Sequence, residues 1–112
     1  MDPPEGSGVT PGAVVLDETI HQPTRLRIMT LLLSQPEGGR LAYGFVQGAL
    51  DLTGGNLTTH LRRLERAGFL VITKEFRDRR PRTWVEATAA GRRAFAVYLE
   101  NLERALGRAP RA

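Results

Sequence analysis

The sequence has 112 residues, no cysteine and a formal net charge of +4 at pH 7, which suits one domain with a modest core and excludes disulfides, thiolate metal sites and thiol nucleophiles. No apolar run approaches the roughly 20 residues of a membrane span, and the start of the chain lacks the pattern of a signal peptide, so we expect a cytoplasmic protein with no membrane partner. The charge is uneven, because residues 1–59 carry three basic and six acidic side chains and residues 60–112 carry thirteen basic and six acidic ones, and a basic half is typical of proteins that bind nucleic acids.

The chain begins with a segment that shows no periodicity. Residues 1–12 are rich in proline, glycine and acidic side chains, so we expect a flexible N-terminal tail, and we expect residues 108–112 to form a flexible C-terminal end. The apolar residues within 13–20 could begin a short helix or a docking segment that Pro23 interrupts. From Pro23 onward, apolar residues spaced by three and four predict a first core helix, which ends at the proline- and glycine-containing breaker over 34–39.

A second helix is predicted over Leu41–Leu52, from a weaker pattern. Gly44 and Gly48 interrupt it, and each costs about 1 kcal/mol relative to alanine in a helix. The apolar residues nevertheless keep helical spacing. The connection that follows, Asp51–Gly54, has the length of the turn in a helix-turn-helix, so this segment is expected to brace the next helix.

The strongest pattern lies over Thr53–Gly68. Leu57, Leu61 and Leu64 recur at i, i+4 and i+7 and form one apolar stripe that must face a core. Thr53 is a helix cap, and Gly68 is a typical C-terminal stop. The opposite face has no acidic residue and consists of Gly55, Thr59, Arg62 and Arg66, with Arg63 beside them and Asn56, Thr58 and His60 on the flanks. Three unpaired arginines on a short helix indicate an anionic partner, and nucleic acid is the candidate.

After Gly68 the apolar period changes from that of a helix to that of a strand. Phe69–Phe76 and Thr83–Ala87 are rich in aromatic and β-branched residues and predict two strands. The residues between them, 77–82, contain four arginines and one proline, so we expect a basic loop. A β-hairpin with a basic tip, directly after a basic helix, predicts a wing.

Thr88 is the cap of a last helix, predicted over Ala89–Leu106. The spacing of its apolar residues by four, three and four is that of a coiled-coil seam rather than a broad core face, so we expect part of this surface to contact a second copy of the chain. The predicted dimer contact consists of Leu16, Ile20, Phe95, Leu99, Leu102 and Leu106. The domain as a whole is predicted over residues 13–107, in the order helix, helix, helix, hairpin, helix.

Several short motifs occur in the order known from one protein family. They are residues 21–29 (HQPTRLRIM), 52–61 (LTGGNLTTHL), 68–69 (GF), Lys74, 80–83 (RPRT) and 88–92 (TAAGR). Over roughly residues 14–106 the chain resembles the short winged-helix transcriptional regulators of the MarR and ArsR groups. The resemblance implies an α+β, mainly α fold, namely a winged helix-turn-helix with a three-helix core, a two-stranded β wing and a C-terminal dimerisation helix. It also implies a homodimer that binds operator DNA, with Thr53–Ala67 as the recognition helix and Val71–Ala87 as the wing.

The sequence therefore predicts a sequence-specific regulator of transcription that binds double-stranded DNA as a homodimer, and no enzyme, metal site or cofactor. Repression is the commonest outcome for such small dimers and is the expectation, while activation stays open. Polar residues in the first turns of the recognition helix are short enough to approach base edges or phosphates, and the arginines could contact a guanine or hold a phosphate. The predicted DNA-binding residues are Gly55, Asn56, Thr58, Thr59, Arg62, Arg63, Lys74, Arg77, Arg79, Arg80 and Arg82.

Two alternative functions remain open. The basic face of a winged helix could bind an acidic protein partner instead of DNA. Alternatively, the chain could be a sensor for an unidentified small-molecule effector that binds between the wing and the dimer helices. The aromatic residues that could line such a pocket are Tyr43, Phe45, Trp84 and Tyr98, although packing in the core accounts for them equally well.

The two histidines are too few for a zinc site without carboxylate help. His60 could contact a base or respond to pH, but its position at the edge of the apolar stripe also fits a residue that packs against the neighbouring helix. His21 fits a capping or dimer-contact residue.

Overall fold

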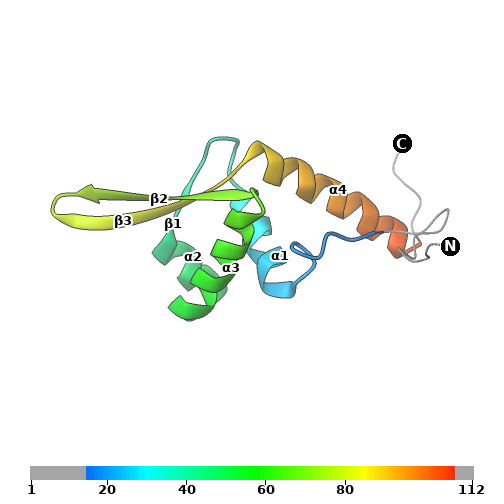
Figure 1. Cartoon of the computed structure of the whole chain (residues 1–112), viewed down its shortest axis with the longest axis horizontal. Helices are drawn as coiled ribbons and strands as arrows, with labels where there is room; N and C mark the ends of the chain where they lie inside the picture. The colour runs from blue at the N-terminus through cyan, green and yellow to red at the C-terminus, as the bar shows by residue number, and fades with distance from the viewer. Residues whose placement is uncertain (1–14, 108–112) are drawn as a thin grey trace.

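A computed structural model describes residues 15–107, and within this range four helices accompany a small antiparallel sheet (Figure 1). The elements are α1 (Pro23–Leu32), β1 (Leu41–Ala42), α2 (Tyr43–Leu50), α3 (Gly54–Arg66), β2 (Leu70–Arg77), β3 (Arg80–Ala87) and α4 (Ala89–Ala105). The tails predicted over residues 1–12 and 108–112 lie outside the described residues. No helix in the described range combines the length and apolar character that a membrane crossing requires.

Helix α3 lies at the centre of the core. Leu57, Leu61 and Leu64 are at most 1% exposed, which confirms the predicted apolar stripe. They pack with the buried side chains of α1, α2 and the sheet, which include Ile28, Met29, Leu32, Val46 and Val85. Burial of this one stripe therefore fixes which side of α3 faces solvent.

The ends of the helices follow from local hydrogen bonds. The Gln22 side chain accepts from the Arg25 amide at the start of α1, and Thr53 accepts from the Asn56 amide at the start of α3. Gly68, predicted as the stop after α3, has a φ of +83°, in the left-handed region where glycine is preferred. The predicted bounds of these two helices are thus confirmed to within a few residues.

The sheet has the strand order β1-β3-β2. Strand β1 pairs with Trp84 and Val85 of β3, and it was not predicted, because two residues are too short to show a period. The second helix was therefore predicted to begin at Leu41, whereas α2 begins two residues later. Pairing with β3 is a tertiary contact that overrides the weak helical pattern at this point.

The hairpin is longer than predicted, and its tip is tighter. Strands β2 and β3 pair from Leu70 with Ala87 out to Arg77 with Arg80, so the expected six-residue loop is a turn of two residues, Asp78 and Arg79. Both have positive φ, 52° and 64°, as in the two-residue turns whose twist matches that of the strands.

Pro81 lies inside β3, opposite Phe76. Next to the turn-closing pair, a residue occupies a non-hydrogen-bonded position in the ladder, so the missing N–H of proline leaves no bond to β2 unmade. On its other side, β1 pairs only with positions 84 and 85. The proline that suggested a loop in the sequence is therefore compatible with the strand.

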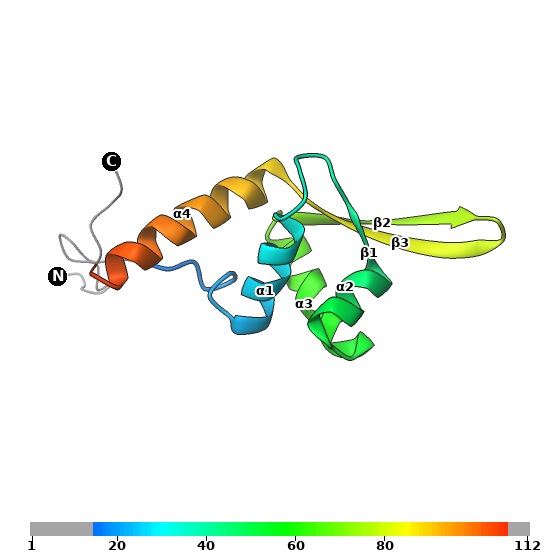
Figure 2. The ribbon, with the colours of Figure 1, turned by 180° about the vertical axis from the view of Figure 1, so that it is seen from behind.

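Helix α4 and the N-terminal segment lie side by side (Figures 1 and 2). The Tyr98 hydroxyl is 2.8 Å from Nδ1 of His21, and the Asn101 side chain donates to the Val15 carbonyl. No helix forms over the described part of 13–20; instead, the Asp17 side chain accepts from the amides of Thr19 and Ile20 in a turn. The segment therefore packs along α4 without extending α1.

Thr88 joins the wing to α4. Its hydroxyl accepts from the Gly91 amide at 2.9 Å, which caps the helix, and donates to the Gly68 carbonyl at 2.6 Å. Gly91 is buried, and a side chain there would overlap the carbonyl of Phe69. The first turn of α4 therefore approaches the α3–β2 connection more closely than any residue with a Cβ allows.

Candidate nucleic-acid interface

The solvent face of α3 carries most of the predicted recognition residues. Gly55, Asn56, Thr59, Arg62 and Arg63 are all exposed. Neither arginine forms a salt bridge with any residue in the range 15–107. A positive surface without its own counter-charge is suited to bind an anion.

Thr58 differs from its neighbours because it is half-buried and faces α2. The Tyr43 hydroxyl donates to the Gly54 carbonyl at 2.9 Å, and it lies 2.8 Å from the Thr58 hydroxyl. Since the single hydrogen of Tyr43 is used on Gly54, Thr58 is the donor in the second bond. Tyr43 and Thr58 thus fix the start of α3 against α2, a positioning role that the sequence did not predict for Tyr43.

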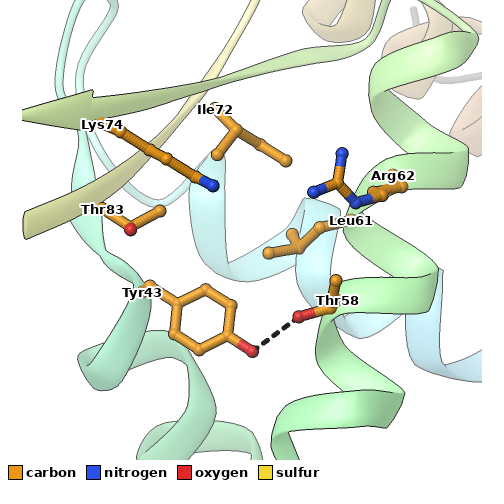
Figure 3. A pocket seen from close by; sticks show the side chains of 7 residues that line it. All are labelled: Tyr43, Thr58, Leu61, Arg62, Ile72, Lys74 and Thr83. Carbon is orange, nitrogen blue, oxygen red and sulfur yellow. Dashed lines mark hydrogen bonds between the residues drawn. The ribbon is translucent and has the colours of Figure 1, made fainter.

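A cleft of about 220 Å³ separates α3 from the wing. Its lining residues are Tyr43, Thr58, Leu61, Arg62, Ile72, Lys74 and Thr83. Figure 3 shows that the ammonium group of Lys74 and the guanidinium group of Arg62 point into this space from opposite sides, from β2 and α3. Two cations from different elements, with hydroxyl groups nearby, form a suitable binding site for one phosphate group.

The two faces of the wing differ in composition. Side chains alternate along a strand, so Lys74 shares the face of Ile72, which borders the cleft. Arg77, Arg80 and Arg82 lie on the opposite face and are exposed. The wing thus carries cations on both of its faces.

Arg79 occupies the turn itself. Its positive φ costs a side-chain-bearing residue about 1 to 2 kcal/mol that glycine would not lose. Because glycine would fit the turn at a lower cost, an arginine at this strained position indicates a function for its charge. Asp78, beside it, is the acidic residue of the tip.

Arg40 anchors the outer face of the wing, and the sequence did not predict it. Its guanidinium lies 4.2 Å from the centroid of the Trp84 ring and forms a salt bridge of 2.9 Å with Glu75. The hydrogen bond from Arg40 lowers the pKa of the Glu75 carboxyl. No sequence signal identified Arg40, because it precedes the unpredicted strand β1. Arg40 thus holds the Glu75 carboxylate in a salt bridge, on the same face of the wing as Arg77 and Arg82.

His60 packs at the edge of α3 against α1. Its Nδ1 atom lies 3.2 Å from a guanidinium nitrogen of Arg25. Partial burial, and then the charge of Arg25, lower the pKa of His60. Burial, and then the charge of Arg63, lower the pKa of Arg25. His60 is therefore a neutral residue at the boundary of the core, where its Nδ1 accepts a hydrogen bond.

The predicted dimer residues differ in exposure. Leu99 on α4 and Leu106 just after it are 44% and 59% exposed, whereas Leu16, Phe95 and Leu102 are half-buried. Ile20 is fully buried within the chain, so its assignment to the dimer contact was wrong. The turn at Asp17 directs this side chain into the protein, which the apolar pattern did not show.

Two further apolar side chains extend the exposed surface near α4. Val15 and Val97 are 58% and 53% exposed, and both border a groove between α4 and the N-terminal segment. Neither belongs to the predicted dimer contact, because Val15 precedes α1 and Val97 lies outside the heptad spacing of α4.

The four aromatic residues considered for an effector pocket do not share a cavity in the described part of the chain. Tyr43 lines the cleft beside α3, Tyr98 lines the groove beside α4, Trp84 packs under Arg40, and Phe45 is exposed. Within residues 15–107 there is also no cluster of three histidine or acidic residues that could hold a metal ion.

Comparisons with known proteins place this geometry in a family. The winged helix DNA-binding domain family matches residues 24–106. A transcriptional regulator homologue from Pyrococcus horikoshii is 36% identical, with a TM-score of 0.74, over 81% of this chain and 87% of that one. A protein from Methanocaldococcus jannaschii is 37% identical over 57 residues, 51% of this chain and 62% of that protein's length.

A more distant structure has the same fold. The MepR protein of S. aureus, solved as a complex with DNA, is 19% identical, with a TM-score of 0.64, over 80% of this chain and 74% of that one. The order of three helices, hairpin and last helix thus confirms the predicted winged-helix fold. The chain belongs to the winged-helix DNA-binding transcriptional regulators, and regulators of the MarR family are among its structural neighbours.

Proposed function

We propose that two copies of this chain bind one pseudo-palindromic site in double-stranded DNA and repress transcription by blocking access to it. The observation that carries the proposal is the set of exposed cations on α3 and on the adjoining wing, none of which has a salt-bridge partner within residues 15–107. Such binding places the action of the protein in the cytoplasm, beside the chromosome of a prokaryotic cell.

Helix α3 enters the major groove with its N-terminal half. The groove admits an α-helix, and base edges are contacted by residues near the helix start. Asn56 and Thr59 are exposed there, and a Cβ at Gly55 would meet no protein atom within 4 Å, so the DNA can approach the helix closely at this point. Arg62 and Arg63 lie one turn further on and contact either a guanine or a phosphate.

The wing and the cleft hold the DNA backbone. Arg62 and Lys74 point into the same cleft, which suits a single phosphate beside the major groove. The arginines of the hairpin extend further along the duplex, where the negative potential of a narrow minor groove attracts arginine. These contacts set the register of α3 rather than the sequence preference.

The dimer forms through α4, at the opposite end of the molecule from the wing tip (Figure 1). Leu99 lies exposed on this helix and Leu106 lies exposed at its C-terminal end, and joining two copies through this surface leaves both wings free. The two α3 helices then occupy half-sites about 34 to 36 Å apart, one turn of DNA.

The test is selection of bound duplexes from a random-sequence pool, followed by a salt titration of the best duplex. We expect the logarithm of the binding constant to fall steeply with the logarithm of salt concentration, by about 0.9 for each phosphate contact. An affinity no better than micromolar at low salt would contradict the proposal and favour the alternative in which the basic face binds an acidic protein.

A second candidate function is response to a small effector in the cleft of about 220 Å³. The specific observation is an apolar floor, formed by Leu61 and Ile72, beneath the two cations Arg62 and Lys74. A small aromatic carboxylate would pair its negative charge with these two cations. It would thereby compete with the DNA phosphate for the cleft and release the DNA. Titration of benzoate into the protein–DNA complex checks this, and undiminished DNA binding at millimolar benzoate would count against it.

A further inference from the structure

The wing carries an exposed aromatic residue that the contacts above do not use. Phe76 is 74% exposed, more than any other large hydrophobic side chain among residues 15–107. It lies directly opposite Pro81 in the hairpin, and Pro81 is also exposed. These two residues, the apolar pair, form a patch one residue pair behind the tip of the wing.

The register of the hairpin determines where this apolar pair faces. Ile72, Lys74 and Phe76 alternate onto one face of β2, and Ile72 and Lys74 on that face border the cleft beside α3. Closer to the helices, the same face is covered by the core. Further out, the wing extends past the helices (Figures 1 and 2), so nothing in the described chain covers Phe76.

The charges around the apolar pair determine which partner it suits. Residues 77–82, around the tip, hold four arginines and one acidic residue, and none of these arginines forms a salt bridge within the described residues. The four are Arg77, Arg79, Arg80 and Arg82. Arg77, Arg80 and Arg82 project from the face of the hairpin opposite to Phe76, so the apolar pair has cations on the other side of the same narrow ribbon. The tip of a second copy would bring the same positive charge and be repelled, whereas a polyanion with an apolar interior is complementary.

We infer that the Phe76–Pro81 pair is an apolar wedge for the minor groove of duplex DNA. The walls of that groove are deoxyribose rings and its rims are phosphates, so Phe76 contacts the walls while the arginines contact the rims. Apolar side chains that enter a minor groove unstack a base step and bend the duplex. The inference rests on the proposed function. It adds a preference for base-pair steps that deform easily, and this preference arises without any hydrogen bond to a base.

The experiment compares variants on the duplex that the wild-type chain selects from a random pool, labelled with a fluorophore at each end. We expect Phe76→Ala to bind about tenfold more weakly, because the burial of one aromatic side chain is lost. The bend measured by energy transfer decreases, and the salt slope is unchanged because no phosphate contact is lost. Phe76→Leu retains most of the affinity and the bend.

Val71→Ala is the matched control, since Val71 is 44% exposed and lies on the opposite face of the same strand. It should bind and bend DNA as the wild type does. Because Phe76 is mostly exposed, Phe76→Ala keeps the fold, which thermal unfolding checks.

Three results would overturn the wedge. They are wild-type affinity and bend in Phe76→Ala, a shallower salt slope in that variant, and a change in its oligomeric state, which would assign Phe76 to a contact between copies. Failure of the wild-type chain to select any duplex would instead overturn the proposed function.

Discussion

Replacing both Arg62 and Arg63 by alanine tests the central assignment most directly. Both side chains are exposed and have no salt-bridge partner within residues 15–107, so their removal leaves no buried group unpaired. Counterion release alone multiplies affinity by roughly fivefold per phosphate contact at 0.15 M salt. Two lost contacts in each protomer, four in the dimer, therefore predict binding of the selected duplex that is weaker by up to about 600-fold, and a loss of at least tenfold needs only two of the four to be phosphate contacts.

The salt dependence gives a second, independent magnitude. In a dimer the two substitutions remove four contacts, so the slope of log K against log salt should become less negative by about 3.6 if all four are phosphate contacts. A smaller change, with the same loss of affinity, would show that one of the arginines contacts a base edge.

The fold should survive this double substitution. Exposed replacements usually change stability by no more than about 0.5 kcal/mol, and removing Arg63 also relieves the like charge that it places near Arg25. The matched control is Arg93→Ala with Arg104→Ala, which removes the same charge from exposed positions of α4. Fluorescence anisotropy measures affinity for both pairs. If Arg62→Ala with Arg63→Ala binds within twofold of wild type, α3 is not the recognition helix.

Three further predictions concern the fold, its pH dependence and the dimer. Gly91→Ala should lower the free energy of unfolding by about 1 to 3 kcal/mol or more through overpacking, measured by urea denaturation, whereas Gly55→Ala should raise it by up to about 1 kcal/mol. Because the pKa of His60 is lowered in the folded chain, stability should be complete above the unfolded pKa of about 6.5 and fall as pH decreases below it. Leu99→Glu with Leu102→Glu should yield monomers in size-exclusion chromatography with light scattering.

Each of these predictions has a result that contradicts it. Equal stability of the two alanine variants would show that the close approach at Gly91 is not required. His60→Gln should flatten the pH profile below about 6.5, and an unchanged profile would assign the slope to other groups. A dimer that persists with both glutamates would place the contact away from the α4 seam.

The sequence alone determined the elements whose signals are local. The leucine stripe of α3 required a core on one side of the helix. The helical period alone then identifies the residues on the opposite face. The caps Thr53 and Thr88 and the stop at Gly68 likewise act within one turn of chain, so the predicted bounds of α3 and α4 agree closely with the structure. Membership of the winged-helix family was also evident from these motifs in order.

Features that depend on pairing between distant segments were missed or misplaced. Strand β1 exists only because β3 lies beside it, and the salt bridge from Arg40 to Glu75 depends on that pairing. The proline and the arginines of the hairpin tip predict a loop, because they are poor strand residues, yet the register places Pro81 where its missing N–H costs nothing.

The exposure of a side chain was decided only by the tertiary structure. From apolar spacing, both Ile20 and Leu99 are predicted to contact a second copy of the chain. In the structure a turn at Asp17 buries Ile20, whereas Leu99 lies on the surface. Spacing likewise gave Thr58 and Thr59 one role, whereas the Tyr43 hydroxyl engages only Thr58. A one-dimensional pattern specifies which face a residue occupies, and the packing of neighbouring elements against that face decides whether the residue remains available to a partner.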